Sequence, residues 1–240
     1  VLAIGDSWTF GVGVPGPMTW PEVLEDLLRA RRRGPVQVVN AGVATGHQSP
    51  DGYDRWFADR GSALDPDLVV VGFSLNDLGP VPMLSYQPVP KEPILGGWSR
   101  FLDHVVWRVR QRRAREAPRD HLLPFLELAR QFEQWQQTQR GLRALRQIAD
   151  ERGITLVVAV FPMLTELERY PYGRLHDIVD EFCAAEGIRC VDLRDRFLGR
   201  VDEDLWVHPA DPHPNRLGHR LLAEGIDEFL QREGLDRAGR

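Results

Sequence analysis

Short apolar runs recur along the chain, and segments with a helical spacing of apolar residues separate them. Most of the runs consist almost entirely of Val, Leu and Ile, without an alternation of apolar and polar positions. Such continuous runs are typical of strands that are buried on both faces of a parallel sheet. We therefore expect five strands, at residues 1–4, 36–39, 68–73, 155–161 and 189–193.

The segments between the runs carry their apolar side chains on one helical face, most clearly at residues 20–28 and 217–230. Alternation of strands and helices predicts an α/β fold in which helices cover a mostly parallel sheet. The 240 residues suit one domain of this kind, and the sequence has no internal repeat. We expect a single domain over residues 1–240.

Residues 80–150 interrupt this alternation, between the third and fourth expected strands. Residues 80–93 are rich in proline and predict an extended loop, because each proline fixes φ and restricts the residue before it. Helical stretches follow at about 98–115 and 120–151. Two interpretations of this helical insertion stay open: a pair of helices packed on the edge of the sheet, or a lid over the functional site.

The composition narrows the class of protein. Apolar residues make up 42% of the chain, which is enough for a sizeable core and unlike the composition of disordered proteins. The formal net charge of −5 argues against nucleic acid as a partner, because binding phosphates requires a surplus of Lys and Arg. Two basic clusters, at residues 29–33 and 108–119, are therefore interpreted as solvated helix faces.

The sequence predicts no transmembrane segment, because no run of about 18 apolar residues is present. The chain begins within an expected strand and without an initiator Met, so a leader or anchor upstream is compatible with it. A cytoplasmic and a secreted location both stay open. The sequence does not indicate an oligomeric state.

A glycine motif after the first expected strand resembles a nucleotide-binding fingerprint only formally. Gly11, Gly13 and Gly16 have the G-x-G-x-x-G spacing. In the dinucleotide fingerprint this motif turns directly from a strand into a helix. Here it starts six residues after the strand, it contains Pro15, and the next expected helix begins only near Trp20. The spacing therefore argues against a nucleotide site.

Ser7 directly follows the first expected strand and is a candidate nucleophile. In open α/β sheets, ligands bind beyond the carboxyl ends of the strands, so a serine there is accessible to substrate. A serine hydroxyl needs a neighbouring base to become an effective nucleophile, and the base needs an orienting acid. His213 and Asp211 can supply these two groups, on a loop that Pro212 and Pro214 stiffen.

Candidate oxyanion donors follow the next two strands. Acyl transfer requires N–H groups that stabilise the negative charge developing on the carbonyl oxygen. Gly42 follows the second run, where the absence of a Cβ lets a backbone N–H approach a ligand closely. Asn76 follows the third run, and its side-chain amide can donate. Asp6 is expected to accept hydrogen bonds from the loop backbone instead of taking part in the chemistry.

These residues form four blocks that resemble, in the same order, the blocks of the SGNH, or GDSL-type, hydrolase family: Gly5-Asp6-Ser7, Gly42, Asn76-Asp77 and Asp211-x-His213-Pro214-Asn215. The resemblance covers residues 1–219 apart from 80–150. Two positions differ from the commonest family pattern. The acid precedes the histidine by two residues instead of three, and Ser74 stands where a glycine is usual.

The resemblance implies a flavodoxin-like, three-layer α/β/α sandwich around a five-stranded, mostly parallel sheet. It also implies roles for the site residues. Ser7 is the expected nucleophile and one oxyanion donor, His213 is the base, and Asp211 is the acid. The Gly42 N–H and the Asn76 Nδ2 complete the expected oxyanion hole. If the Asp211 carboxylate points away, a backbone carbonyl orients the histidine and the site is a dyad.

The expected function is hydrolysis of carboxylic esters through an acyl-enzyme. The substrate is then a small-molecule, carbohydrate or lipid ester, and the sequence does not identify which. Neither a metal nor an organic cofactor is expected, since the spacing of His208, His213 and His219 fits no standard zinc pattern. Two alternatives stay open: an O-acyltransferase that uses the same site, and a binding module without catalysis on a hydrolase-like fold.

Overall fold

The structure, a computed structural model, describes residues 1–31, 34–43, 52–79, 99–116 and 128–237. The proline-rich loop expected at residues 80–93 lies outside the described residues. The larger elements, in chain order, are β1 (Leu2–Gly5), α1 (Ser7–Phe10), α2 (Trp20–Arg31), β2 (Val39–Gly42), α3 (Tyr53–Asp59), β3 (Leu68–Ser74), α4 (Arg100–Glu116), α6 (Glu133–Arg152), β4 (Thr155–Phe161), α7 (Gly173–Glu186), β5 (Arg189–Asp192), β6 (Trp206–His208), β7 (Asp211–Pro214) and α8 (Arg216–Arg232).

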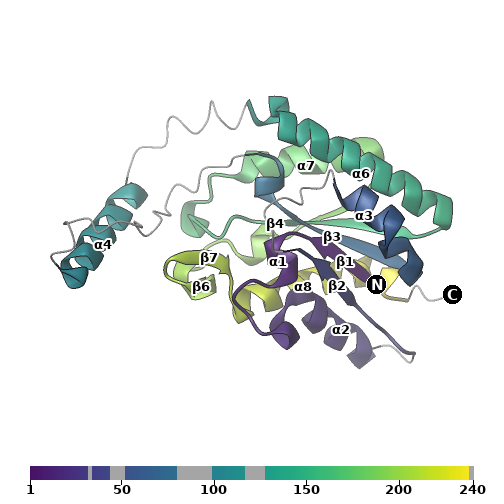
Figure 1. Ribbon diagram of the computed structural model, residues 1–240, viewed down its shortest axis with the longest axis horizontal. Helices are drawn as coiled ribbons and strands as arrows, with labels where there is room; N and C mark the ends of the chain where they lie inside the picture. Colours follow the sequence, from purple (N-terminus) through teal and green to yellow (C-terminus); the bar gives the residue numbers. More distant parts are fainter. Residues whose placement is uncertain (32–33, 44–51, 80–98, 117–127, 238–240) are drawn as a thin grey trace.

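Strands β1 to β5 form one parallel sheet in the order β2-β1-β3-β4-β5, which confirms the expected α/β fold (Figure 1). Every residue of β1 and β3 is buried, as the continuous apolar runs predict. Strand β1 lies between β2 and β3, so these three strands are neighbours in the sheet. The carboxyl ends of these three strands therefore lie side by side.

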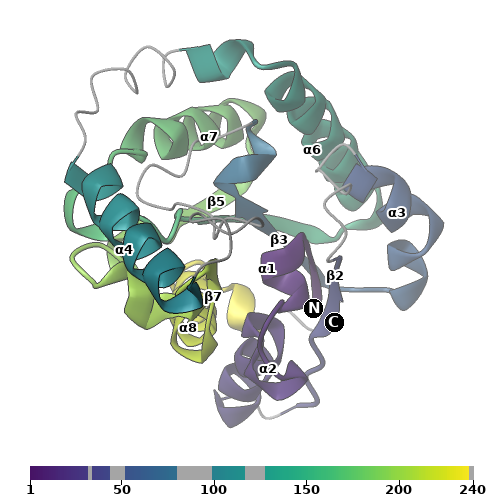
Figure 2. The same cartoon turned by 60° about the vertical axis from the view of Figure 1, so that its left-hand side comes forward.

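Helices cover both faces of the sheet and bury two separate apolar cores. One core lies under α3, α6 and α7, and the other lies under α2 and α8 (Figure 2). The side chains of β1 and β3 alternate between the two cores: Val69 and Val71 point to the first, and Val70 points to the second. The result is the three-layer α/β/α arrangement that the family resemblance implies.

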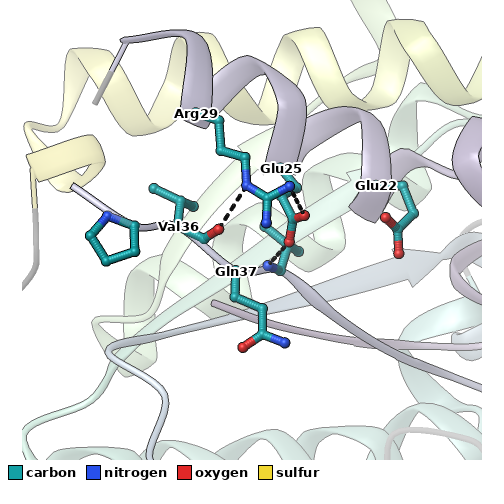
Figure 3. A pocket seen from close by; sticks show the side chains of 7 residues that line it. Glu22, Glu25, Arg29, Val36 and Gln37 are labelled. Atoms are coloured by element: carbon teal, nitrogen blue, oxygen red, sulfur yellow. Dashed lines mark hydrogen bonds and ion pairs between the residues drawn. The ribbon is translucent and has the colours of Figure 1, made fainter. Parts of the chain in front are cut away.

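The second strand begins three residues later than expected, at Val39. Val36 and Val38 are buried, and side chains of α2 bind one backbone group of each (Figure 3). The Val38 N–H donates to Glu25 Oε2 over 2.6 Å, and Arg29 Nε donates to the Val36 carbonyl over 3.0 Å. The apolar run therefore indicated burial correctly. Its first residues, however, bond to side chains of α2 instead of pairing with a neighbouring strand.

The region between β3 and β4 contains two helices with different surroundings. Helix α6 connects the two strands and packs on the sheet, where Trp135, Leu142 and Leu145 are almost completely buried. This helix begins at Glu133, and a 3-10 turn at Ala129–Gln131 precedes it. Helix α4 stands apart from the layers over the sheet (Figure 1). The part of residues 80–150 that the structure describes thus includes both a covering helix and an outlying one.

In the described part of the chain, every helix is too short or too polar to span a lipid bilayer.

Candidate active site

Three glycines form a level row where the carboxyl ends of the first three strands meet. Gly5 pairs with Gly42 on one side and with Gly72 on the other. A Cβ on Gly5 would lie 2.1 Å from Thr9 Oγ1, and one on Gly72 would lie 2.5 Å from the same atom. A Cβ on Gly42 would lie 2.1 Å from the backbone nitrogen of Phe10. The row therefore lets α1 lie directly against the sheet edge.

Helix α1 begins at Ser7, immediately after β1, and presents this serine at its first position. Asp6 caps the helix, because its Oδ1 accepts a hydrogen bond from the Trp8 N–H over 2.9 Å, as expected for a residue that stabilises the loop backbone. Gly11 ends the helix in the left-handed conformation, with φ of +89°. Sequence reasoning missed this helix, since four residues are too few for a periodic apolar pattern.

His213 lies on a short antiparallel hairpin formed by β6 and β7, where only a stiff loop was expected. Asn215 anchors the hairpin to α8. Its Oδ1 caps the helix by accepting from Leu217 and Gly218, and its Nδ2 donates to the carbonyl of Asp204 over 2.7 Å. An Asn before an amphipathic run is a typical N-cap signal, so the sequence held this information.

His213 lies within hydrogen-bonding distance of both Ser7 and Asp211, and we refer to the three residues as the Ser7 triad. His213 Nε2 lies 2.9 Å from Ser7 Oγ, and His213 Nδ1 lies 2.6 Å from Asp211 Oδ1. The two-residue spacing of acid and base follows from the strand geometry, since residues i and i+2 of a strand share a face. The Asp211 carboxylate points toward the imidazole, so the arrangement is not the dyad that was left open.

The triad is partly accessible to solvent, and the contact with His213 favours the ionised form of Asp211. The His213 side chain is 30% exposed and that of Asp211 is 39% exposed. Partial burial opposes ionisation of Asp211, but hydrogen bonds from the His213 ring and backbone outweigh it and lower the pKa of this carboxyl. Asp211 is therefore ionised at neutral pH and favours the tautomer of His213 that carries its proton on Nδ1.

The two candidate oxyanion donors beyond Ser7 lie at the same edge, and both have acceptors within the protein. The Gly42 N–H donates to Asn40 Oδ1 over 2.9 Å, and the Asn40 amide donates to the Thr9 carbonyl over 2.9 Å. Asn76 Nδ2 donates to Asp6 Oδ2 over 3.4 Å. An amide nitrogen carries two hydrogens, so Asn76 keeps a second donor while it holds Asp6. The Gly42 N–H has a single hydrogen, which Asn40 engages.

Ser74, which stands where the family usually has glycine, ties two blocks of the site together. Its hydroxyl donates to Asp6 Oδ2 over 2.7 Å and also contacts Asn76 Oδ1. Its backbone N–H donates to Asp77 Oδ2 over 3.3 Å, which closes a capping box around the turn that carries Asn76. Sequence reasoning noted Ser74 only as a departure. No local pattern could reveal a contact with Asp6, 68 positions away.

The other two histidines near the C-terminal hairpin are separate from the triad. His219 on α8 is fully buried, and its Nδ1 accepts from the Trp20 N–H over 3.2 Å. Burial, with the nearby charge of His213, lowers the pKa of His219 to about 4. His208 is exposed and accepts from the Ala210 N–H over 3.1 Å. Across the described residues, no three His, Cys, Asp or Glu side chains are arranged to hold a metal ion.

A second set of the same three groups, which we call the Tyr170 triad, lies between β4, α7 and β5. The Tyr170 hydroxyl lies 2.8 Å from His176 Nε2, and His176 Nδ1 lies 2.8 Å from Asp192 Oδ1. His176 is fully buried, and Arg194 Nε lies 3.0 Å from Asp192 Oδ2. Burial raises the pKa of the Tyr170 phenol well above its usual value. Sequence reasoning did not single out any of these residues.

Known structures with the same fold include several esterases. An acetylxylan esterase from Geobacillus stearothermophilus, Axe2, is 20% identical over 97% of this chain and 93% of its own, with a TM-score of 0.58. A protein of the G-D-S-L family from Desulfitobacterium hafniense DCB-2 is 18% identical over 95% and 98%, with a TM-score of 0.56. A two-domain esterase active on acetylated mannans is 16% identical over 100% of this chain and 49% of its own, with a TM-score of 0.58.

A comparison with curated protein sequences finds no match. The sequence profile of the GDSL-like Lipase/Acylhydrolase family, however, matches residues 3–221, which is nearly the whole chain. That match includes all four blocks at the edge of the sheet. The chain therefore belongs to the GDSL-like lipase/acylhydrolase family, whose members are carboxylic ester hydrolases.

Proposed function

We propose that this protein hydrolyses short acyl esters, acetyl esters in particular, through a covalent acyl-enzyme on Ser7. The observation that carries the proposal is the unbroken contact from Ser7 Oγ through His213 to Asp211, over 2.9 and 2.6 Å. This order of hydroxyl, imidazole and carboxylate is the arrangement that activates a serine for attack on a carbonyl carbon. Its partial exposure gives an ester access to the hydroxyl.

In the proposed reaction, Ser7 Oγ attacks the ester carbonyl while His213 Nε2 takes the hydroxyl proton. The tetrahedral intermediate then collapses, and His213 returns the proton to the leaving alcohol. Water attacks the acyl-enzyme in the same way, with His213 as base, and releases the carboxylic acid and free Ser7. Asp211 stabilises the imidazolium that forms in both halves of the reaction.

The proposed oxyanion hole uses the Ser7 N–H, the Gly42 N–H and the Asn76 amide. The first backbone N–H groups of a helix have no partner within the helix, so α1 leaves the Ser7 N–H available. The Asn76 amide can donate its second hydrogen to the oxyanion without releasing Asp6. The Gly42 N–H must share its hydrogen with Asn40 Oδ1, so we expect it to contribute less than Asn76.

Two sets of relatives support acetyl esters as the first substrates to examine. Axe2 is described as an acetylxylan esterase, and the two-domain relative as active on acetylated mannans. Variants of Axe2 in which a serine or a histidine is replaced by alanine are described as catalytic mutants. The same two residue types form the core of the Ser7 triad.

Hydrolysis of p-nitrophenyl acetate by the wild type and by S7A tests the proposal. The matched control is S62A, which removes the hydroxyl of another serine on a 3-10 turn away from the triad. We expect S62A to keep full turnover and S7A to lose it. If S7A retains the wild-type rate, Ser7 is not the nucleophile.

The alternatives predict different products. An acyltransferase would transfer the acetyl group to an added sugar or alcohol in preference to water, which chromatography of the products detects. A binding module would form no covalent adduct with a fluorophosphonate probe at Ser7, whereas we expect stoichiometric labelling that S7A abolishes.

A further inference from the structure

Helix α4 exposes an apolar stripe on the side that a surface helix normally keeps polar. Phe101, Val105 and Val109 follow one another at four-residue spacing and are 73%, 39% and 45% exposed. Leu102, beside this stripe, is 41% exposed. Residues at this spacing share one face, so the four side chains form a continuous apolar surface about 100° wide.

The stripe is separate from the part of α4 that is covered by protein. Trp107 is only 5% exposed and lies on the opposite side of the helix from Val105 and Val109. Four of the ten large apolar side chains that are exposed in the described residues lie on this one helix. Scattered exposed apolar residues are normal, whereas a contiguous group marks an interaction surface.

The charge of α4 opposes the charge of the whole chain. Residues 100–116 contain six arginines and two acidic residues, while the chain has a net charge of −5. Arg108, Arg110 and Arg113 are exposed; Arg108 and Arg113 flank the apolar stripe on its two sides, and Arg110 lies farther around the helix. Clusters of arginine beside an exposed apolar face are the features by which helices bind at an anionic lipid interface.

The helix is also placed where it can reach a surface. Figure 1 shows α4 away from the helical layers, off the end of the molecule that carries β6 and β7. Figure 2, with that side turned forward, shows α4 in front of the body. The carboxyl ends of the strands and the Ser7 triad lie at the same end of the molecule. Helix α4 therefore stands clear of the helices that cover the sheet, where a lipid surface can approach it.

We propose that α4 docks the protein on an anionic lipid surface, with Phe101, Leu102, Val105 and Val109 inserted among the lipids and the arginines at the headgroups. The alternative of a second copy is disfavoured by charge, because pairing two α4 helices would bring arginines against arginines. The sequence predicts that this basic cluster is a solvated helix face. Under the proposal its arginines bind lipid headgroups instead. The inference does not depend on the proposed hydrolysis.

Sedimentation with lipid vesicles tests the proposal. We expect the wild type to bind vesicles of phosphatidylcholine with phosphatidylglycerol and to leave vesicles of phosphatidylcholine alone in the supernatant. Binding should weaken as salt is raised, because surface charges are screened. A triple variant F101S/V105S/V109S and a triple variant R108E/R110E/R113E should each lower the partition coefficient at least about tenfold.

Two control variants match these changes elsewhere on the surface. L64S/L198S/V201S removes three other exposed apolar side chains, and R140E/R152E/R189E makes the same change in net charge away from α4. Both controls should bind anionic vesicles like the wild type. All four variants should keep their circular dichroism spectra and their hydrolysis of p-nitrophenyl acetate, since the substituted residues are exposed and outside the triad.

Three results would overturn the proposal. One is equal binding to neutral and anionic vesicles, or none to either. Another is a concentration-dependent dimer, seen by light scattering, that the α4 variants dissociate and that lipid does not affect. The third is a loss of hydrolysis of the soluble ester in the α4 variants with unchanged vesicle binding, which would make the helix a lid.

Discussion

The Ser7 triad and the Tyr170 triad place the same three groups in the same order. In both, an imidazole Nε2 faces a hydroxyl, at 2.9 and 2.8 Å, and Nδ1 faces a carboxylate, at 2.6 and 2.8 Å. Their surroundings differ. The histidine of the first is 30% exposed, and the histidine of the second is 0% exposed.

This difference shows that a hydroxyl, an imidazole and a carboxylate in this order do not by themselves form a catalytic site. The phenol of Tyr170 also accepts from the Met163 N–H over 3.0 Å, and Arg194 lies against the carboxylate of Asp192. The hydroxyl and the carboxylate of this triad are therefore held by other groups of the protein, and its imidazole is fully buried. Such a network stabilises the packing of α7 on the sheet. The Ser7 triad combines the same contacts with an open side and with nearby N–H donors.

The largest expected effect separates the two hydroxyls. S7A should lower kcat for p-nitrophenyl acetate by at least about 10⁴-fold, because the nucleophile is lost. Y170F should leave kcat within about twofold and lower the free energy of unfolding by about 1–3 kcal/mol, because the hydrogen bonds of the phenol with His176 and with the Met163 N–H are both lost. Steady-state kinetics and urea unfolding measure the two quantities. A large loss of kcat in Y170F would show that the buried triad takes part in the reaction.

The carboxylates provide the next comparison. D211N should lower kcat by about 10³- to 10⁴-fold, because the amide favours the wrong tautomer of His213 and does not stabilise the imidazolium. D192N should act on stability and leave kcat nearly unchanged. The rates of both variants are measured at pH 8. An unaffected kcat in D211N would mean that another group orients the imidazole.

Asn76, which we propose as an oxyanion donor beside the Ser7 triad, provides the next test. N76A should lower kcat by about 10²- to 10³-fold with a small change in KM, because the donor acts on the transition state. Initial rates over a range of substrate concentrations separate the two parameters. If KM rises and kcat does not fall, Asn76 binds the substrate instead of stabilising the oxyanion.

His219 adds a third imidazole, which has no carboxylate partner among the contacts described above. Its folded pKa of about 4 lies below the unfolded value, so between about pH 6.5 and 4 the unfolded state binds more protons. Its contribution to stability is therefore complete above pH 6.5 and lost as the pH falls toward 4, in total on the order of 3 kcal/mol.

The variant H219Q, which keeps an acceptor for the Trp20 N–H, should reduce the dependence of unfolding free energy on pH in this window. H208Q, at an exposed histidine, is the matched control and should retain the wild-type dependence. Urea unfolding at several pH values between 4 and 7 measures both. Identical pH dependences in H219Q and the wild type would contradict the burial argument.

The smallest expected effect concerns Ser74, which restrains Asp6 and Asn76 next to the Ser7 triad. S74A should lower kcat by about tenfold and leave KM unchanged, because the amide donor is held less firmly. S62A again serves as the control. A kcat for S74A equal to that of S62A would show that the remaining contacts hold Asn76 without the hydroxyl.

Much of this architecture could be predicted from the sequence, because it depends on local patterns. The apolar runs located four of the five strands to within a residue or two and identified the α/β fold. The order of the four blocks predicted that Ser7 and His213, 206 positions apart, lie close together. These predictions succeeded because strand burial and strand-end chemistry are each visible in a few consecutive residues.

Several features that the sequence did not predict depend on side-chain contacts between different elements, which no local pattern reveals. The start of β2 depends on Glu25 and Arg29, which bind the backbone of Val36 and Val38. The Tyr170 triad joins a loop residue with residues of α7 and β5, and no sequence motif links them. Helix α4 has the expected period, but the sequence alone could not indicate which of its two apolar faces is covered.

The level row of Gly5, Gly42 and Gly72 has a consequence for altering this enzyme. A methyl group on any of the three would meet an atom of α1 at 2.5 Å or less, so α1, which begins with Ser7, is held close against the strands only while these positions are glycine. Directed evolution toward new esters should therefore find almost no tolerated changes in this row. If Ser7 is the nucleophile as proposed, variation in acyl-chain preference has to come from residues outside this row, while Ser7 stays where the backbone holds it.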